Sequence, residues 1–302
     1  MLIDRVVEGT KQKKNPCIVG LDPEWEKLPE CYKNMGKEKA ECILQWAKDI
    51  IDVLGDVVVA VKPQMAFYEI YGAEGMAVFQ QIVAYAHSKG LIVIDDSKRN
   101  DIGNTARAYA YAHLSPEGPI NTDFLTVSPF LGRDSIEPFV ETAKKADKGI
   151  FVLVKTSNPG SGEISESRNT EGKSVSDFLA EHVSEIGETA IGTSGYSAFG
   201  AVVGATFPKE AKSLREIMKR NYFLVPGYGA QGGSAENIAA CFHPDGLGAL
   251  VSSSRGILYH YEQVEEYDGS KEMYLDIVKR QAIQMQQEVY AALKKNCKEM
   301  AY

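Results

Sequence analysis

No apolar run in the 302-residue sequence approaches the length of about 18 residues needed to span a bilayer. Residues 1–14 also lack the features of a signal peptide, because charged residues interrupt the apolar ones and no small-residue cleavage site follows. Neither a membrane anchor nor an export signal is indicated, and we expect a cytoplasmic protein.

Cysteine and histidine are scarce, with five residues of each. The cysteines are odd in number and no two have Cys-x-x-Cys spacing; they are Cys17, Cys31, Cys42, Cys241 and Cys297. No two histidines are four residues apart, so the paired-histidine spacing typical of zinc sites is missing. We expect neither a disulfide framework nor a metal centre.

Basic residues are fewer than acidic ones, and the net charge is −8. A general nucleic-acid binder usually carries a basic face, so that class is disfavoured, but a local basic pocket for a phosphate is still compatible. The chain is long enough for two domains, yet an α/β barrel of roughly 250 residues routinely forms one unit. We assign residues 1–302 to one domain.

Short apolar segments alternate with stretches of helical periodicity. The expected strands are residues 17–21, 57–61, 91–94, 124–127, 150–154, 198–203, 222–225 and 248–251. The expected helices between and after them are residues 38–53, 74–87, 134–145, 175–185, 209–219 and 272–293. Eight buried parallel strands alternating with helices predict a (β/α)8 barrel, with a doubly wound open sheet as the alternative.

One connection, residues 156–172, is long, polar and rich in glycine and serine. Loops of this length in a compact domain are usually functional or disordered. Over the mouth of a barrel it would suit a lid, and the alternative is a tolerated surface insertion.

Polar residues gather where the expected strands end, which is where barrel enzymes carry their reactive groups. Asp96 and Lys98 share one face of an extended strand because they are two residues apart, and Asp95 should point the other way. Lys62, at the end of the neighbouring strand, could reach the same place. At ~4 Å and an effective dielectric of ~20, one opposite pair is worth about 4 kcal/mol. The alternative interpretation is a structural ion-pair network.

Two glycine-rich loops predict a phosphate site. Residues 225–233 follow the seventh expected strand and contain Gln231, and residues 252–257 follow the eighth and contain Arg255. Glycines let backbone N–H groups approach an anion, and barrel phosphate sites commonly use these two loops. Arg255 can supply a charged fork to phosphate oxygens.

The segment Asp96-x-Lys98-x-x-Asp101-Ile102-x-x-Thr105 resembles the signature of orotidine 5′-phosphate decarboxylases. The resemblance spans nearly the whole chain and is strongest to the longer, second type of this enzyme. In order, it is reinforced by Gly20-Leu21-Asp22, Val61-Lys62-Pro63-Gln64, Lys155-Thr156-Ser157-Asn158-Pro159, Pro226-Gly227-Tyr228-Gly229-Ala230-Gln231 and Ser254-Arg255-Gly256.

The resemblance implies a homodimer of (β/α)8 barrels that converts orotidine 5′-monophosphate to uridine 5′-monophosphate, the last step of de novo pyrimidine nucleotide synthesis, without metal or cofactor. Lys98 would donate the proton to C6 as carbon dioxide leaves, and Asp96 would lie beside the substrate carboxylate. Lys62 and Asp101 would complete the charged array. Asp101 and Thr105 would act in the partner's site.

The resemblance also implies the residues that bind the rest of the substrate. Asp22 and Lys62 would hold the ribose hydroxyls, and Thr156 or Ser157 would meet the pyrimidine edge. The other implied substrate-binding residues are Pro226 near the ring, Gln231 and Arg255 at the phosphate, Ser254 beside Arg255, and Gln64, where some relatives have a different polar residue. The loop of residues 157–172 would close over the base.

Two other functions are compatible with parts of this pattern. A Mg²⁺-dependent phosphate-binding barrel, such as a keto-gulonate phosphate decarboxylase or a hexulose-phosphate synthase, has a related array, but Lys62, the Lys-Pro-Gln segment and Arg255 favour orotidylate. A non-catalytic nucleotide-binding barrel is the second alternative, and it has no need of two lysines and two aspartates.

Overall fold

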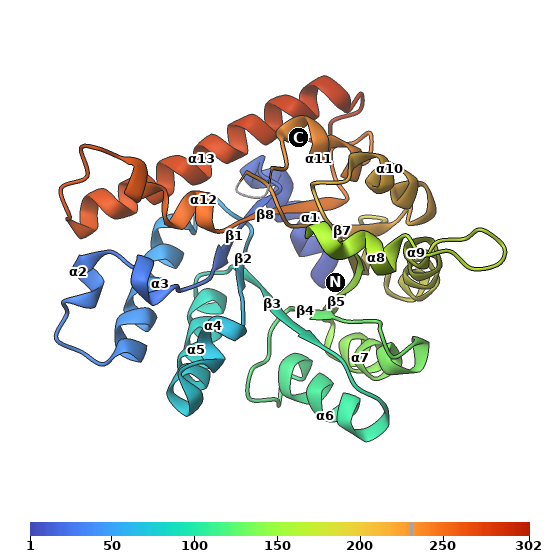
Figure 1. The fold of residues 1–302 in the computed structure, drawn as a ribbon, viewed down its shortest axis with the longest axis horizontal. Helices are drawn as coiled ribbons and strands as arrows, with labels where there is room; N and C mark the ends of the chain where they lie inside the picture. The colour runs from blue at the N-terminus through green and yellow to red at the C-terminus, as the bar shows by residue number, and fades with distance from the viewer. Residues whose placement is uncertain (230–231) are drawn as a thin grey trace.

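A computed structural model describes residues 1–229 and 232–302. Eight parallel strands form a closed barrel in sequence order, β1 to β8, with helices around it (Figure 1). The strands are β1 (Cys17–Leu21), β2 (Ala60–Pro63), β3 (Ile92–Arg99), β4 (Phe124–Val127), β5 (Gly149–Lys155), β6 (Ser197–Val203), β7 (Asn221–Val225) and β8 (Ala249–Ser253). The predicted (β/α)8 barrel is confirmed, and the open sheet is wrong because β1 pairs with both β2 and β8.

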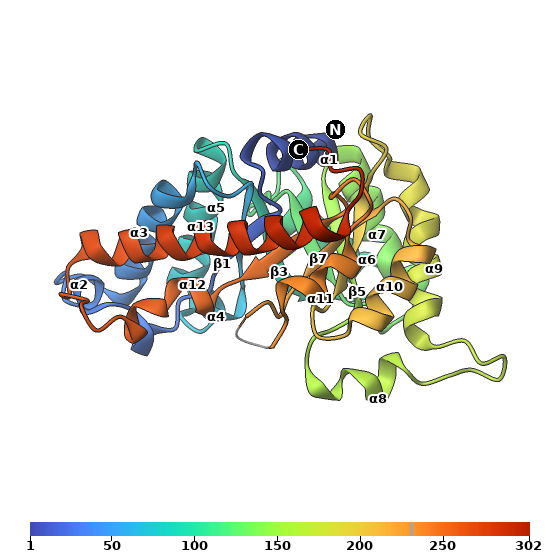
Figure 2. The same cartoon turned by 90° about the horizontal axis from the view of Figure 1, so that it is seen from above.

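Six helices follow the apolar periodicity of the sequence to within a few residues. They are α3 (Lys39–Leu54), α5 (Gly72–Ser88), α7 (Arg133–Ala146), α9 (Val175–Gly187), α10 (Pro208–Ile217) and α13 (Lys271–Asn296). The last of these runs along one side of the barrel (Figures 1 and 2). Short α-helical turns are α2 (Glu30–Lys33), α4 (Ala66–Glu69), α8 (Gly162–Ser165), α11 (Ala235–Ile238) and α12 (Arg255–Leu258). Within the described ranges, no helix is long and apolar enough to cross a membrane.

Besides the short turns, two longer helices among the described residues were not expected from the sequence. In α6 (Gly103–Leu114) the buried face consists of alanines, one histidine and one leucine, so its apolar stripe is weak. The other, α1 (Leu2–Lys13), contacts segments that precede strands. The amide of Leu2 donates to Asp147 before β5, and Asp4 accepts from the amide of Ser194 before β6. We conclude that α1 covers the N-terminal end of the barrel.

The second and third strands end later than their apolar residues indicated. The third extends to Arg99, although the apolar run stops at Ile94, and the second extends to Pro63. Apolarity located these strands, and Lys62, Asp96 and Lys98 lie at their polar ends, as the sequence predicted. The connection after β5, predicted as a lid or a surface insertion, contains a 3₁₀ turn (Pro159–Ser161) and α8, and the segment after α8 projects away from the barrel (Figure 2).

Aromatic rings fill the barrel interior below the strand ends. Phe124 and Phe151 stack with their centroids 4.9 Å apart. Gly200 on β6 provides the necessary room, because a Cβ there would lie 2.8 Å from the Phe151 ring. This packed layer closes the barrel and leaves the carboxyl ends of the strands for a site.

A buried carboxylate joins several elements at the opposite, N-terminal end. Asp123, just before β4, lies 2.8 Å from Nε2 of His87 and 3.3 Å from the ammonium of Lys148, and it accepts a hydrogen bond from the amide of Val93. Burial would raise the pKa of Asp123, but the hydrogen bond with His87 and the charge of Lys148 outweigh it and hold the pKa below its ordinary value.

This network predicts acid sensitivity. A carboxylate with a lowered pKa adds stability above its unfolded-state pKa, near 3.8, and that stability is lost as the pH falls through the folded-state value. We expect Asp123→Asn to lower the free energy of unfolding at pH 7 by about 2 kcal/mol. In this variant the free energy of unfolding should also decrease less steeply as the pH falls. Urea unfolding from about pH 7 down to about pH 3 measures both, and an unchanged acid slope would contradict this role.

Candidate active site

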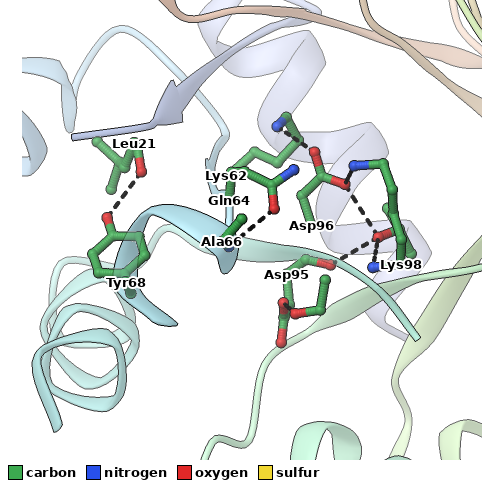
Figure 3. A network of polar contacts seen from close by, with 10 residues as sticks. Leu21, Lys62, Gln64, Ala66, Tyr68, Asp95, Asp96 and Lys98 are labelled. Carbon is green, nitrogen blue, oxygen red and sulfur yellow. Dashed lines mark hydrogen bonds and ion pairs between the residues drawn. The ribbon is translucent and has the colours of Figure 1, made fainter. Parts of the chain in front are cut away.

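The ends of β2 and β3 bring three charged side chains together. The Lys62 ammonium lies 2.8 Å from Oδ2 of Asp96, and the Lys98 ammonium lies 2.6 Å from Oδ1 of the same carboxylate. Figure 3 shows Asp96 between the two lysines. The side chains of Lys62 and Asp96 are 7% and 13% exposed, whereas that of Lys98 is 45% exposed. These three side chains, Lys62, Asp96 and Lys98, form a row of alternating charge, which we call the charged row. The row presents one ammonium, that of Lys98, to solvent.

The charges in this row support one another despite burial. Burial would raise the pKa of Asp96, but the two ammonium groups outweigh it and hold the pKa well below its ordinary value. Burial would lower the pKa of Lys62, but Asp96 and Asp22 outweigh it and raise the pKa. Asp96 and Lys62 are thus both ionised at neutral pH.

Asp95 leaves β3 on the other side, as the two-residue period of a strand predicts. Its carboxylate is fully buried and lies 2.6 Å from Nδ1 of His113 in α6. Arg99 extends this outer network, because its guanidinium lies 3.3 Å from Nε2 of His113 and 2.6 Å from Glu69. The outer row ties the end of β3 to the surrounding helices while the inner row faces the cavity.

The backbone at Lys98 has a conformation that is uncommon for a residue other than glycine. Its φ is +49°, and the register between β3 and β4 shifts between Asp95 and Arg99. Thr126 on β4 stabilises this turn, because its Oγ1 accepts a hydrogen bond from the Lys98 amide at 2.9 Å and lies 3.2 Å from Oδ1 of Asp96. Such conformations persist where surrounding contacts fix them, often at functional sites.

The row forms part of the wall of a cavity of about 1130 Å³ at the carboxyl ends of the strands. The cavity brings together most of the residues that the sequence singled out. Besides the three charged residues, these are Asp22, Gln64, Thr156, Ser157, Pro226, Ser254 and Arg255. Gly20 permits the close approach of the loop after β8, since a Cβ there would lie 1.8 Å from Oγ of Ser254.

Asp22 carries an unusual oxygen. Its Oδ1 is buried and has no hydrogen-bond partner among the described residues. Burial, opposed by Lys62, raises the pKa of Asp22. The main chain around it is well held, because Tyr68 donates to the carbonyl of Leu21 at 2.8 Å and Tyr259 donates to the carbonyl of Asp22 at 2.6 Å. A rigid, unsatisfied acceptor of this kind can receive a hydroxyl from a ligand.

Two of the predicted residues that the structure describes, Asp101 and Thr105, do not line this cavity. Asp101 accepts a hydrogen bond from the amide of Ile102, and its carboxylate contacts neither lysine of the row. Thr105 is exposed in the first turn of α6. Gln231 lies outside the described residues.

Sequence reasoning missed several residues at the site. Thr126 is the last polar residue of an apolar strand, one residue before its end, and could have been found by the rule that identified the other strand ends. Glu24, Phe67, Thr206, Phe207 and Tyr228 also line the cavity, but they come from loops and short turns whose course the sequence does not indicate. In residues 1–229 and 232–302, no group of three or more His, Cys, Asp or Glu side chains could hold a metal ion.

Comparisons with known proteins agree along nearly the whole chain. Residues 15–269 match the model of the "Orotidine 5'-phosphate decarboxylase / HUMPS family". The chain is 43% identical over 281 residues to an orotidine 5′-phosphate decarboxylase of Rhodopirellula baltica, covering 90% of this chain and 93% of that protein. It is 37% identical to one of Clostridium novyi, covering 96% and 98%. The solved structure of Leishmania donovani OMP decarboxylase is similar with a TM-score of 0.75 and 28% identity, covering 97% of this chain and 98% of that one.

The burial of the row predicts unequal effects of removing its members. Asp96→Asn leaves the Lys62 ammonium buried without its carboxylate, and we expect the free energy of unfolding to fall by about 3 kcal/mol. Lys98→Met removes the more exposed partner, and we expect a change below about 1 kcal/mol. Urea unfolding at pH 7 and one fixed protein concentration compares them. Equal stability of the two variants would contradict the role of the buried pair.

Proposed function

The chain belongs to the orotidine 5′-phosphate decarboxylase / HUMPS family, and we propose that it converts orotidine 5′-monophosphate to uridine 5′-monophosphate and carbon dioxide. This reaction is the last step of de novo pyrimidine nucleotide synthesis. The observation that carries the proposal is the Lys98 ammonium, which faces an open cavity while Asp96 holds it at 2.6 Å.

The proposed step breaks the bond between C6 and the substrate carboxylate. Carbon dioxide leaves, the electron pair remains on C6, and a proton moves from Nζ of Lys98 to C6. A fixed ammonium stabilises the carbanion more than it stabilises the bound substrate, which is the condition for lowering the barrier. The substrate carboxylate would lie beside Asp96, and their repulsion would be relieved as carbon dioxide departs. Solvent would then reprotonate Lys98.

The other cavity residues support binding of a nucleotide monophosphate. The unsatisfied Oδ1 of Asp22 can accept a ribose hydroxyl, and Lys62 lines the same cavity, close enough for its charge to act on Asp22. We assign the phosphate to Arg255 and Gln231, with Ser254 beside them, and the pyrimidine edge to Thr156 or Ser157. Pro226 would pack near the ring and Gln64 would be a further polar contact. Binding energy from the distant phosphate would position the base for reaction.

We further propose that two copies complete each other's sites. Asp101 and Thr105 do not line their own chain's cavity, although they follow the charged strand end directly. Exposed apolar residues occur on the same connection and on the next one: Ile102, after β3, is 54% exposed, and Phe130 and Leu131, after β4, are 78% and 47% exposed. Exposed apolar groups on neighbouring connections, with a carboxylate that contacts neither lysine of its own site, suit a symmetric interface in which the same surface occurs on both subunits. Asp101 would then reach the partner's row.

We propose that the reaction needs neither metal nor cofactor and takes place in the cytoplasm. The substrate itself supplies the leaving carboxylate, and the proton comes from a side chain, so the atoms balance without a further group. A related Mg²⁺-dependent activity on a sugar phosphate is the alternative that a chelator distinguishes.

Turnover can be measured directly. Purified protein is expected to deplete the absorbance of orotidine 5′-monophosphate at the same rate with and without EDTA. Lys98→Ala should lower kcat by at least about a thousandfold, because it removes both the carbanion's counter-charge and the proton donor. A full rate in that variant would refute the mechanism, and inhibition by EDTA would favour the Mg²⁺-dependent alternative.

Shared sites predict complementation between two inactive variants. Co-expressed Asp96→Asn and Asp101→Asn subunits should recover about a quarter of wild-type specific activity, because random pairing gives half heterodimers with one intact site each. Co-expressed Asp96→Asn and Lys98→Ala subunits are the matched control and should recover nothing, since both lesions lie in their own subunit's site. Equal recovery in the two mixtures would contradict the assignment of Asp101 to the partner.

A further inference from the structure

A second buried lysine lies at the end of β5, where the mechanism has no use for it. The side chain of Lys155 has 0% exposure. Its ammonium donates to Oγ of Ser165 at 2.9 Å and to Oε1 of Glu166 at 2.6 Å, and it lies 4.3 Å from the centre of the Phe207 ring. A buried ammonium costs several kcal/mol unless its partners are well placed, so this arrangement requires an explanation.

The partners of Lys155 come from the loop that begins at Lys155 itself. Glu166 follows α8 and is eleven residues further along the chain, with 52% of its side chain exposed. The ion pair therefore joins the two ends of residues 155–166. Ser165 further stabilises the fold of this loop, because its hydroxyl also donates to the carbonyl of Ser161 at 2.7 Å. The hydrogen bond from Lys155 lowers the pKa of Glu166, so the Glu166 carboxyl is ionised at neutral pH.

The cavity is lined by residues from the first part of the segment 155–166, whose ends the ion pair joins. Thr156, Ser157, Asn158 and Pro159 line the cavity, and residues 160–172 do not. The carbonyl of Ser157 accepts a hydrogen bond from Thr206, which lies beside Phe207 in the loop after β6. The segment after α8 stands away from the barrel (Figure 2). The predicted lid therefore divides into a held inner part and a projecting outer part.

We propose that Lys155 is a positioning residue that holds Thr156–Pro159 over the base end of the cavity through Ser165 and Glu166. The assignment of that end to the base rests on the proposed function. Without Glu166, the buried Lys155 ammonium loses its counter-charge. The loop would then open more often, because opening lets water solvate the ammonium. The substrate would then have to order the loop as it binds, which weakens binding without removing a group from the reaction.

The test compares Glu166→Ala with Glu163→Ala. Both remove an exposed carboxylate at or next to α8, but the Glu163 side chain has no hydrogen bond or ion pair with a described residue. We expect Glu166→Ala to raise KM for orotidine 5′-monophosphate by roughly fivefold to tenfold and to change kcat by less than about twofold. Glu163→Ala should match the wild type. Glu166→Gln keeps an acceptor for Lys155 and should recover part of the KM.

A second readout does not depend on turnover. Hydrogen exchange measured by mass spectrometry should be faster over residues 156–166 in Glu166→Ala, and saturating uridine 5′-monophosphate should restore protection. Over residues 156–166, the double variant Lys155→Met/Glu166→Ala should exchange no faster than the faster of the two single variants. The reason is that both substitutions remove the same contact.

The outcomes separate the two proposals. Faster exchange with a raised KM supports the positioning role. Unchanged exchange in Glu166→Ala overturns the proposal that the Lys155–Glu166 pair holds the loop. Faster exchange with an unchanged KM overturns the proposed role of the held loop in substrate binding. If the wild-type protein does not turn over orotidine 5′-monophosphate, the proposed function fails, and the exchange data still decide whether Lys155 holds the loop.

Discussion

The carboxylate of Asp96, bonded on each side to an ammonium group, is the interaction on which the arrangement of the site depends. Two lysines would not remain close together in a partly buried position without it. The register of the barrel makes the contact possible, because Val61 pairs with Val93 and so places Lys62 level with Ile94, two residues below Asp96. The long side chain of Lys62 covers that difference in height. Closure of the sheet thus fixes the distances that electrostatics requires.

Two kinds of buried lysine occur at the strand ends, and they differ in what their partners can do. Lys62 is bonded to a carboxylate that is itself mostly buried and that faces the cavity. Lys155 is bonded to a carboxylate that is half exposed and that sits on a loop. The first pair can hold a charge fixed during a reaction, because neither partner moves easily. The second can open, since one partner can return to water, and this makes it suitable for holding a movable segment.

Much of the fold and of the charged row followed from the sequence because both depend on short-range patterns. Apolar runs located the strands, and the two-residue period correctly separated Asp95 from Asp96. Thr126 was missed because its strand was read for apolarity alone. The partners of Lys155 could not be found, since they depend on how residues 156–166 turn back. The helix α6 was missed because alanines and a buried His113 replace the usual large apolar residues.

The closed barrel has one more consequence, which concerns recognition. In the described parts of the chain, every named strand has a neighbour on both sides, so the sheet offers no edge to which another chain could add a strand. A second copy can be recognised only by side chains on helices and loops. The exposed apolar Ile102 lies on the connection that follows Asp96 and Lys98, and Phe130 lies on the connection after the next strand, β4. If two copies pair through this face as proposed, substitutions that alter the pairing fall on connections next to the charged residues, so association and chemistry would be constrained to evolve together.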